Sequence, residues 1–210
     1  MIYELKTYDL RPHSLEEVER RFQEAHERRE TISHLSASFH TEIGPLNQVV
    51  QISRYKNHAE RDRAEAAFRE WPPESIRDHI VQETTETFVP FSFSPPMEPG
   101  KIGPCFEMRR YTYSDGDRPR IERAWEGALP ERVTHSPLVF IATCEAGDVR
   151  QLVHIWAYPS LDRRAEVRRA VRATGSWPPH VLARKRGWEP YTFLEQENRI
   201  MLPSPCSPLQ

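Results

Sequence analysis

The strongest constraint on the fold is an internal repeat. The stretch YELKTYDL at 3–10 aligns with FEMRRYTY at 106–113, and QVVQISRY at 48–55 aligns with QLVHIWAY at 151–158, both pairs 103 positions apart. Two well separated blocks in one register are hard to obtain by chance. A period near one hundred residues is also far longer than a solenoid repeat. The chain is therefore predicted to be a duplicated domain.

Proline marks where the two copies join. Residues 90–104 carry five prolines and two glycines, which suit neither a helix nor a strand interior. The end of the sequence is similarly rich in proline. The expected organisation is a first domain at 1–94, a linker at 95–104, a second domain at 105–202 and a tail at 203–210.

Each copy predicts the order strand, helix, strand, strand, helix, strand. Ser14 and Glu17 have the spacing of a capping box before an amphipathic helix, and Gly44-Pro45 indicates a turn between two strands. This α+β order is that of a ferredoxin-like unit, a four-stranded antiparallel sheet with both helices on one face. The other face of such a sheet is bare. We therefore expect the two sheets to pair within the chain.

The composition excludes several classes of protein. Hydrophobic residues make up 38% and charged residues 29%, as in a soluble globular protein, and the formal net charge of −2 gives no electrostatic case for nucleic acid or an anionic membrane. The three cysteines, Cys105, Cys144 and Cys206, show no paired spacing for a disulfide framework or a structural zinc site. No apolar run approaches the ~20 residues that span a bilayer. The sequence predicts a cytoplasmic protein.

The repeated blocks resemble the NIPSNAP family pattern. That pattern has a YELR-type first strand and a later N-x-V-x-H-x-W-x-Y strand followed by a short charged helix, here YELKTYDL, NQVVQISRY and VRQLVHIWAYPSLDRRAEVR. The resemblance implies the dimeric α/β barrel fold, closed within one chain by the two repeats. The wider superfamily includes cofactor-independent oxygenases, cyclases, isomerases and haem enzymes, whereas NIPSNAP proteins are mostly described as interaction or vesicle-related proteins. The resemblance therefore indicates the fold far better than the function.

The two repeats depart from each other at the family positions. The second repeat has His154 and Trp156 in the expected places, whereas the first has Gln51 and Ser53 at the matching positions. The two halves are chemically unequal. A single reactive site is expected to lie in the second repeat.

Side chains alternate across a strand, so each strand offers two faces. We expect the apolar face with Val153 and Ile155 to pack on helices, and the opposite faces of the two sheets to meet around an enclosed cavity. On those faces the candidate catalytic residues are His154, Tyr158, Arg109, Tyr111 and Glu107, and the candidate substrate-binding residues are Trp156, Tyr8, Glu4, Lys6, Gln51, Tyr55 and His40. The same residues could instead form cross-strand salt links and an interface core.

The favoured hypothesis is a cofactor-independent enzyme of bacterial specialised metabolism acting on a hydrophobic or aromatic small molecule. It would be a cyclase, isomerase, dehydratase or monooxygenase in which His154 moves a proton near neutral pH, Tyr158 or Tyr111 donates, and Arg109 holds an oxyanion. The alternative is a non-catalytic binding or interaction module. A cavity of at least ~300 Å³ reaching His154 would favour the enzyme.

A haem or metal protein is a further alternative, through His34, His40, His135 or His180. The sequence shows no HxxxH motif, Gly-rich phosphate loop or GxSxG motif. We therefore expect no cofactor and no metal, and a homodimer of the two-repeat chain is left open.

Overall fold

The computed structural model describes residues 1–68, 71–144 and 150–210. The elements of the first repeat are β1 (Ile2–Leu10), α1 (Leu15–Glu24), α2 (His26–Glu30), β2 (Leu35–Ile43), β3 (Gln48–Tyr55), α3 (His58–Ala67), α4 (Glu74–Arg77) and β4 (Ile80–Pro90). Those of the second repeat are β5 (Cys105–Tyr113), α5 (Arg118–Arg132), β6 (Leu138–Cys144), β7 (Gln151–Tyr158), α6 (Leu161–Ala173), α7 (Pro179–Lys185) and β8 (Phe193–Pro203).

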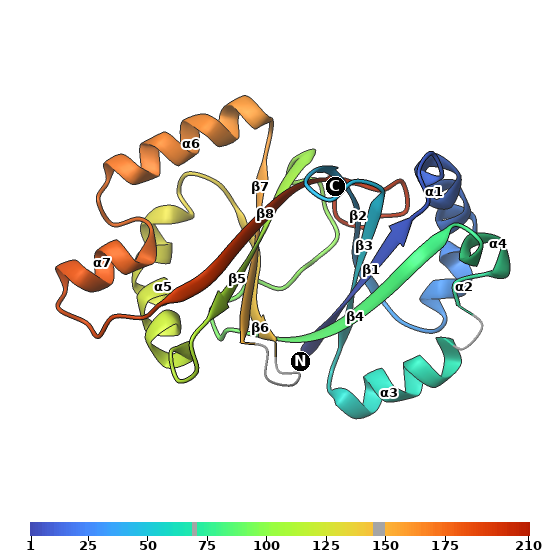
Figure 1. The fold of residues 1–210 in the computed structure, drawn as a ribbon, viewed down its shortest axis with the longest axis horizontal. Coiled ribbons are helices and arrows are strands. Elements are labelled where there is room, and N and C mark those ends of the chain that lie inside the picture. Colours follow the sequence, from blue (N-terminus) through green and yellow to red (C-terminus); the bar gives the residue numbers. More distant parts are fainter. Residues whose placement is uncertain (69–70, 145–149) are drawn as a thin grey trace.

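The strands close into one barrel in the order β1-β3-β2-β8-β5-β7-β6-β4. Within each repeat the pairing is antiparallel and matches the ferredoxin-like order. Between repeats β4 pairs with β6 and β8 pairs with β2, so the last strand of each repeat reaches the other sheet. Figure 1 shows α1–α4 outside one half of the barrel and α5–α7 outside the other. The predicted intrachain α/β barrel is confirmed.

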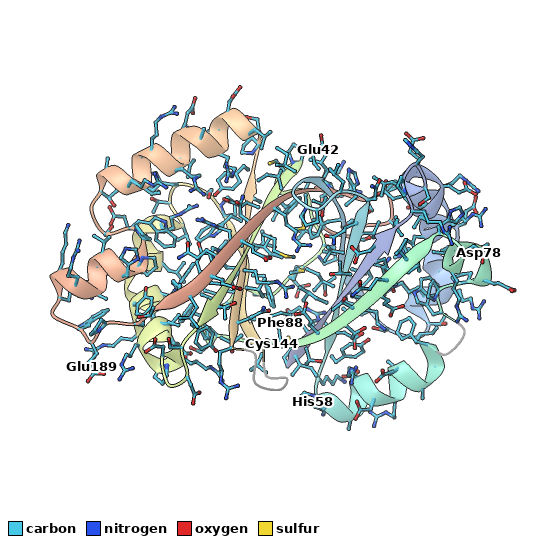
Figure 2. All side chains as sticks on the ribbon, viewed as in Figure 1. Glu42, His58, Asp78, Phe88, Cys144 and Glu189 are labelled. Carbon is cyan, nitrogen blue, oxygen red and sulfur yellow. The ribbon has the colours of Figure 1, made fainter. Side chains whose placement is uncertain are left out.

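Side chains of both repeats fill the interior of the barrel. Phe39 of the first repeat packs on Phe106 of the second with ring centroids 4.7 Å apart, and Tyr3 packs on Phe140 at 4.8 Å. These four rings are at most 2% exposed. Figure 2 shows side chains throughout the space between the halves, and it labels Phe88 and Cys144, which pair across the β4–β6 junction. An eight-stranded barrel is just wide enough to be filled in this way.

The prediction of which strand face points inward is wrong. Val153, Ile155 and Ala157 belong to the barrel interior, together with Leu5 and Met108. The opposite face, with Trp156 and Tyr158, packs on α5 and α6 instead. The physical reason is that the barrel interior is closed and accommodates mainly apolar groups, whereas long polar side chains on the outer face can reach past the helices to water.

The linker and the residues after β8 close one end of the barrel. The backbone of Gln210 bonds to Gly100 and Ile102, and the Ser207 hydroxyl accepts from the Ser38 amide at 3.0 Å. Leu209 is 2% exposed and belongs to the interior cluster. The end of the chain therefore takes part in the core.

Local side-chain caps account for the starts of two helices, one in each repeat. Ser160 and Asn57 cap α6 and α3 by accepting from the backbone amides three residues on. Ser14 stands at the N-cap of α1, but its hydroxyl donates to the Arg11 carbonyl, so the predicted capping box does not form.

Candidate functional site

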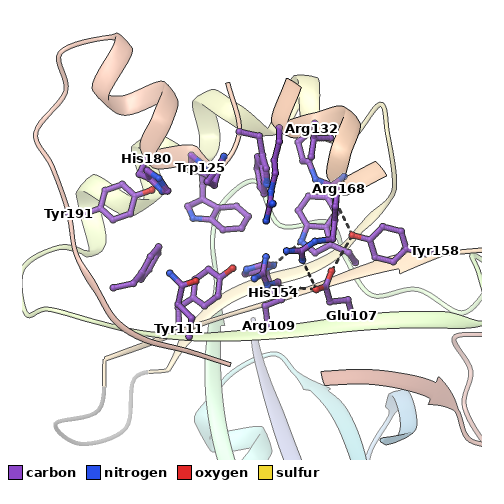
Figure 3. A pocket seen from close by; sticks show the side chains of 18 residues that line it. Glu107, Arg109, Tyr111, Trp125, Arg132, His154, Tyr158, Arg168, His180 and Tyr191 are labelled. Atoms are coloured by element: carbon purple, nitrogen blue, oxygen red, sulfur yellow. Dashed lines mark hydrogen bonds and ion pairs between the residues drawn. The ribbon is translucent and has the colours of Figure 1, made fainter. Parts of the chain in front are cut away.

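A cavity of about 150 Å³ lies between the sheet of the second repeat and its helices (Figure 3). The strands β5 and β7 form its floor, and α5, α6 and the start of α7 form its walls. Its volume is half of the ~300 Å³ that would have favoured the enzyme over the binding module, although the cavity does reach His154. An apolar cavity of about this volume can hold a single benzene ring.

Six of the predicted residues come together here: His154, Tyr158, Arg109, Tyr111, Glu107 and Trp156 line the cavity. They do so from the helix-facing side of the sheet and not from within the barrel. The other six lie in the first repeat. Tyr8 and Tyr55 pack among its helix-side core, Glu4 pairs with Arg61 of α3, and Gln51 lies beside Arg29, while Lys6 pairs with Glu83 and His40 with Glu19. These six do not converge on the cavity.

Glu107 is the anionic centre of the cavity floor. It is 1% exposed, and its carboxylate accepts from Arg164 at 2.5 Å, from Arg168 at 3.0 Å and from the Tyr158 hydroxyl at 3.3 Å. Burial alone would raise the pKa of this carboxyl, but the guanidinium groups of Arg164, Arg109 and Arg168 together lower it. Glu107 is therefore ionised, and its oxygens are already bonded, so it is poorly placed to accept a proton.

Arg132 is held over the indole of Trp156, with its guanidinium carbon 3.8 Å from the ring centroid. It donates to the Ser136 hydroxyl at 2.8 Å and to the Tyr158 hydroxyl at 3.0 Å. Tyr158 donates in turn to Glu107. This chain of contacts fixes the arginine on α5 against the sheet, and its Nε has no hydrogen-bond partner among the described residues.

His154 is held in one tautomer. The Trp156 indole donates to its Nδ1 at 2.8 Å, and an indole nitrogen can only donate. Nδ1 therefore carries the lone pair, and the neutral ring carries its proton on Nε2. Burial and the positive charges of Arg109 and Arg132 lower the pKa of His154 well below its usual range. The side chain is a neutral donor at Nε2 at neutral pH, and not the base that its unperturbed pKa suggested.

This shift has a measurable consequence for stability. The pKa of His154 is lower in the folded protein than in the unfolded chain, where it is near 6.5. As pH falls below that value, the unfolded chain binds a proton that the folded protein does not bind, so the free energy of unfolding decreases. We expect wild type to lose up to about 1.4 kcal/mol more per pH unit below ~6.5 than His154→Gln, which introduces the residue of the first repeat. Urea unfolding at pH 7.5, 6 and 5 measures the difference. A surface variant, His34→Gln, controls for the loss of a histidine, and identical wild-type and His154→Gln profiles would contradict the assignment.

Sequence reasoning missed the walls of the cavity. Trp125 of α5 and Trp177 pack edge to face at 5.2 Å, and Trp125 lies 4.6 Å from the His154 ring between centroids. The remaining residues that line the cavity from the helices and the chain around β8 are Arg132, Arg168, Val171, Arg172, Pro178, Pro179, His180, Tyr191, Phe193 and Gln196. Two sequence signals could have found these walls: Trp125 shares an apolar helix stripe with Ile121 and Ala128, and WPP occurs at both 71–73 and 177–179. Both become informative once the strand face with His154 and Trp156 is known to pack on the helices.

The first repeat has a larger side chain at the position that matches Val171. Val171 corresponds to Phe68, which is 6% exposed and packs edge to face on Trp71. Lys6, at the position of Arg109, lies over the Phe68 ring at 5.6 Å, and Arg29 lies over the same ring at 5.7 Å. Phe68 therefore occupies the place that Val171 leaves open in the second repeat.

The histidines considered for metal or haem are spread over the molecule. His34 lies beside Glu30, His40 beside Glu19, and His180 on the cavity rim, whereas His135 follows α5. Within residues 1–68, 71–144 and 150–210, no group of three His, Cys, Asp or Glu side chains could hold a metal ion.

The comparisons with known proteins agree with this architecture. Residues 3–95 and 106–208 match the NIPSNAP family model. The chain belongs to the NIPSNAP family. Human Protein NipSnap homolog 2 is 24% identical over 229 residues, covering 100% of this chain and 75% of that protein. Human Protein NipSnap homolog 3B is 27% identical over 218 residues, covering 99% and 85%.

A solved structure is similar to this NIPSNAP chain over nearly its whole length. A candidate monooxygenase from Lactobacillus acidophilus aligns with a TM-score of 0.66 over 97% of this chain and 93% of that one. At 11% identity, this likeness shows the fold alone. The family resemblance drawn from the sequence is confirmed. The described helices also include none with the length and apolarity needed to cross a membrane.

Proposed function

We propose that this NIPSNAP protein binds a small aromatic or hydrophobic molecule in the second-repeat cavity and converts it without a cofactor, by proton transfer through an enolate-like state. The observation that carries the proposal is a cavity with aromatic walls and converging ionisable groups, beside a first repeat in which Phe68 takes the equivalent space. Such a combination is typical of small-molecule sites. The alternative is a binding or interaction module that uses the same cavity without chemistry.

The described groups suggest separate roles. The Nε2–H of His154 and the Trp125 indole N–H have no hydrogen-bond partner among the described residues, so both are suited to stabilise a developing oxyanion. Burial raises the pKa of Tyr111 and Tyr158, so both phenols stay protonated at neutral pH. The Tyr158 proton is already donated to Glu107, so Tyr111 is the better placed of the two to donate to such an anion.

His180 is the proposed general base. It lies on the exposed rim of the cavity, across from Glu107 (Figure 3), and burial together with the nearby Arg184 lowers its pKa below the usual value. The ring is therefore neutral at pH 7 and able to accept a proton. This assignment moves the base from His154, where the sequence placed it, to a residue that the sequence suggested only as a metal ligand.

The binding part of the proposal is tested by closing the cavity with the side chain of the first repeat. We expect Val171→Phe to abolish binding of single-ring aromatic compounds such as benzyl alcohol and benzoate, because the new ring takes the available volume. Quenching of tryptophan fluorescence measures binding. The control is Ala64→Val on α3 of the first repeat, which introduces the residue that the second repeat has at the matching position 167. We expect this variant to leave binding intact. Equal binding by wild type and Val171→Phe would place the ligand elsewhere.

The catalytic part is tested by proton exchange. We expect the protein to accelerate exchange of the methyl hydrogens of acetophenone in D₂O, followed by NMR, and His180→Ala to slow it about 10²-fold because a general base is removed. Binding without any exchange above background would support the non-catalytic alternative. Unchanged exchange in His180→Ala would remove His180 from its role.

A further inference from the structure

The charges around the cavity are strongly unbalanced. Of the described residues that line it, Arg109, Arg132, Arg168 and Arg172 are cationic and Glu107 alone is anionic. Glu107 is already engaged by Arg164 and Arg168. Arg109 lies further away, with its Nε 3.8 Å from the nearest Glu107 oxygen. The cavity therefore has positive charge that no described carboxylate neutralises at close range.

Most of the unsatisfied polar atoms on lining residues are donors, and the exception is the Tyr191 hydroxyl, which can donate or accept. Four buried nitrogens on lining residues have no hydrogen-bond partner among the described residues: Nε of Arg109, Nε of Arg132, Nε1 of Trp125 and Nε2 of His154. Arginine and indole nitrogens can only donate, and Trp156 holds His154 in the tautomer whose Nε2 donates. Buried polar groups in native proteins are normally satisfied. Acceptor oxygens, and not further donors, would complement nitrogens of this kind.

The walls limit the rest of the ligand. The ring of Trp177 stands perpendicular to those of Trp125 and Trp156, with interplanar angles of 88° and 87°. With a volume of about 150 Å³, these faces suit one planar ring and little more.

From the excess of guanidinium groups, the four unpartnered donors and the aromatic walls, we infer that the cavity selects a single-ring aromatic carboxylate. The inference rests on the proposed function and names its ligand class. The carboxylate lies against the partly exposed guanidinium group of Arg109, and the ring lies among the tryptophans. Charge-assisted hydrogen bonds from guanidinium to carboxylate are stronger than neutral ones, so the charge of the ligand decides its affinity.

Three probes of nearly equal size separate the possibilities: benzoate, benzyl alcohol and benzylamine. At pH 7.5 and low salt we expect benzoate to bind at least about tenfold more tightly than benzyl alcohol, because hydrogen bonds to charged groups contribute more. Benzylamine is expected to bind least. Added salt should weaken benzoate binding and leave benzyl alcohol unaffected. Calorimetric titration of the whole chain measures all three.

Arg109→Met supplies the decisive variant, because the Arg109 side chain is a fifth exposed and its removal leaves the Glu107 bonds to Arg164 and Arg168 intact. We expect benzoate affinity to fall about tenfold, to the level of benzyl alcohol, with benzyl alcohol unchanged. The control is Lys6→Met at the matching position of the first repeat, which removes the same charge far from the cavity and leaves both affinities as in wild type.

The outcomes separate this inference from the proposal on which it rests. Equal affinity for benzoate and benzyl alcohol in wild type, both lost in Val171→Phe, would overturn the inference and leave the cavity as a neutral aromatic site. Unchanged benzoate affinity in Arg109→Met together with no salt dependence would also overturn it. Absence of binding by all three probes would overturn the proposed function itself.

Discussion

Phe106→Ala is expected to destabilise the whole chain by about 3–5 kcal/mol, because truncating a buried phenylalanine removes its burial and leaves a cavity. Phe106 is fully buried and packs on Phe39 of the other repeat in the barrel interior. That interior belongs to both repeats. We therefore expect a single urea unfolding transition at lower denaturant, and not the loss of one half.

Two further variants make this result specific. Phe39→Ala should cost a similar amount, and the double variant should cost less than the sum, since the two rings contact each other. Phe93→Ala, which removes a half-buried ring from the segment before β5, should cost clearly less. Two separate transitions, each assignable to one repeat, would show that the interior is not shared in the way described.

Glu107→Ala is the second large effect, with an expected loss of about 3 kcal/mol, because breaking a buried ion pair from one side leaves its partners uncompensated. The variant would leave Arg164, Arg168 and Arg109 facing one another around an empty position. We expect a loss of stability at the lower end of the usual range, because the side chains of Arg164 and Arg168 are about a quarter exposed. Urea unfolding at pH 7 measures it.

The pH dependence identifies the charge as the cause. The pKa of Glu107 is lowered in the folded protein. The stabilisation from its ionised carboxylate is therefore fully present above the unfolded pKa near 4.3 and is lost as pH falls through the folded pKa. The gap between wild type and Glu107→Gln should therefore close in acid. The control is Glu4→Ala, whose carboxylate is similarly buried but pairs only with Arg61 among the described residues, and which should cost less. A gap that stays constant from pH 7 to pH 3 would assign the loss to packing.

The fold was within reach of the sequence because it depends on repetition and on local signals. The repeat implies two equal units, and the strand–helix order of each unit leaves one bare sheet face that needs a partner. Ser160 and Asn57 begin their helices with the caps that their side chains predict. Ser14 shows the limit, since its hydroxyl bonds to Arg11 instead.

The inward face was predicted wrongly for a reason that the sequence itself contains. Val153, Ile155 and Ala157 are wholly apolar, as are Phe106 and Met108 on the neighbouring strand. A closed eight-stranded interior needs such a face. The mixed face with His154 and Arg109 needs neighbours that supply counter-charges and a route to water, and helices supply both. The wholly apolar face suits the water-free barrel interior and the mixed face suits the side covered by helices, which is the observed arrangement.

The cavity itself could not be predicted from spacing alone. The pairing of Trp156 with His154 and the stacking of Arg132 on Trp156 depend on rotamers and on how closely α5 approaches β7. The difference between Val171 and Phe68 was visible in the repeat alignment. Its effect on the cavity depends on the three-dimensional structure, which places Val171 on the cavity wall.

Joining both halves in one polypeptide has a consequence for how such a protein can change. In a barrel assembled from two identical subunits, every substitution is made twice and both sites alter together. Here a replacement such as phenylalanine for valine at the end of one helix affects a single half. One half can thus keep a purely structural role in completing the barrel, while the cavity of the other half can change to bind a different ligand.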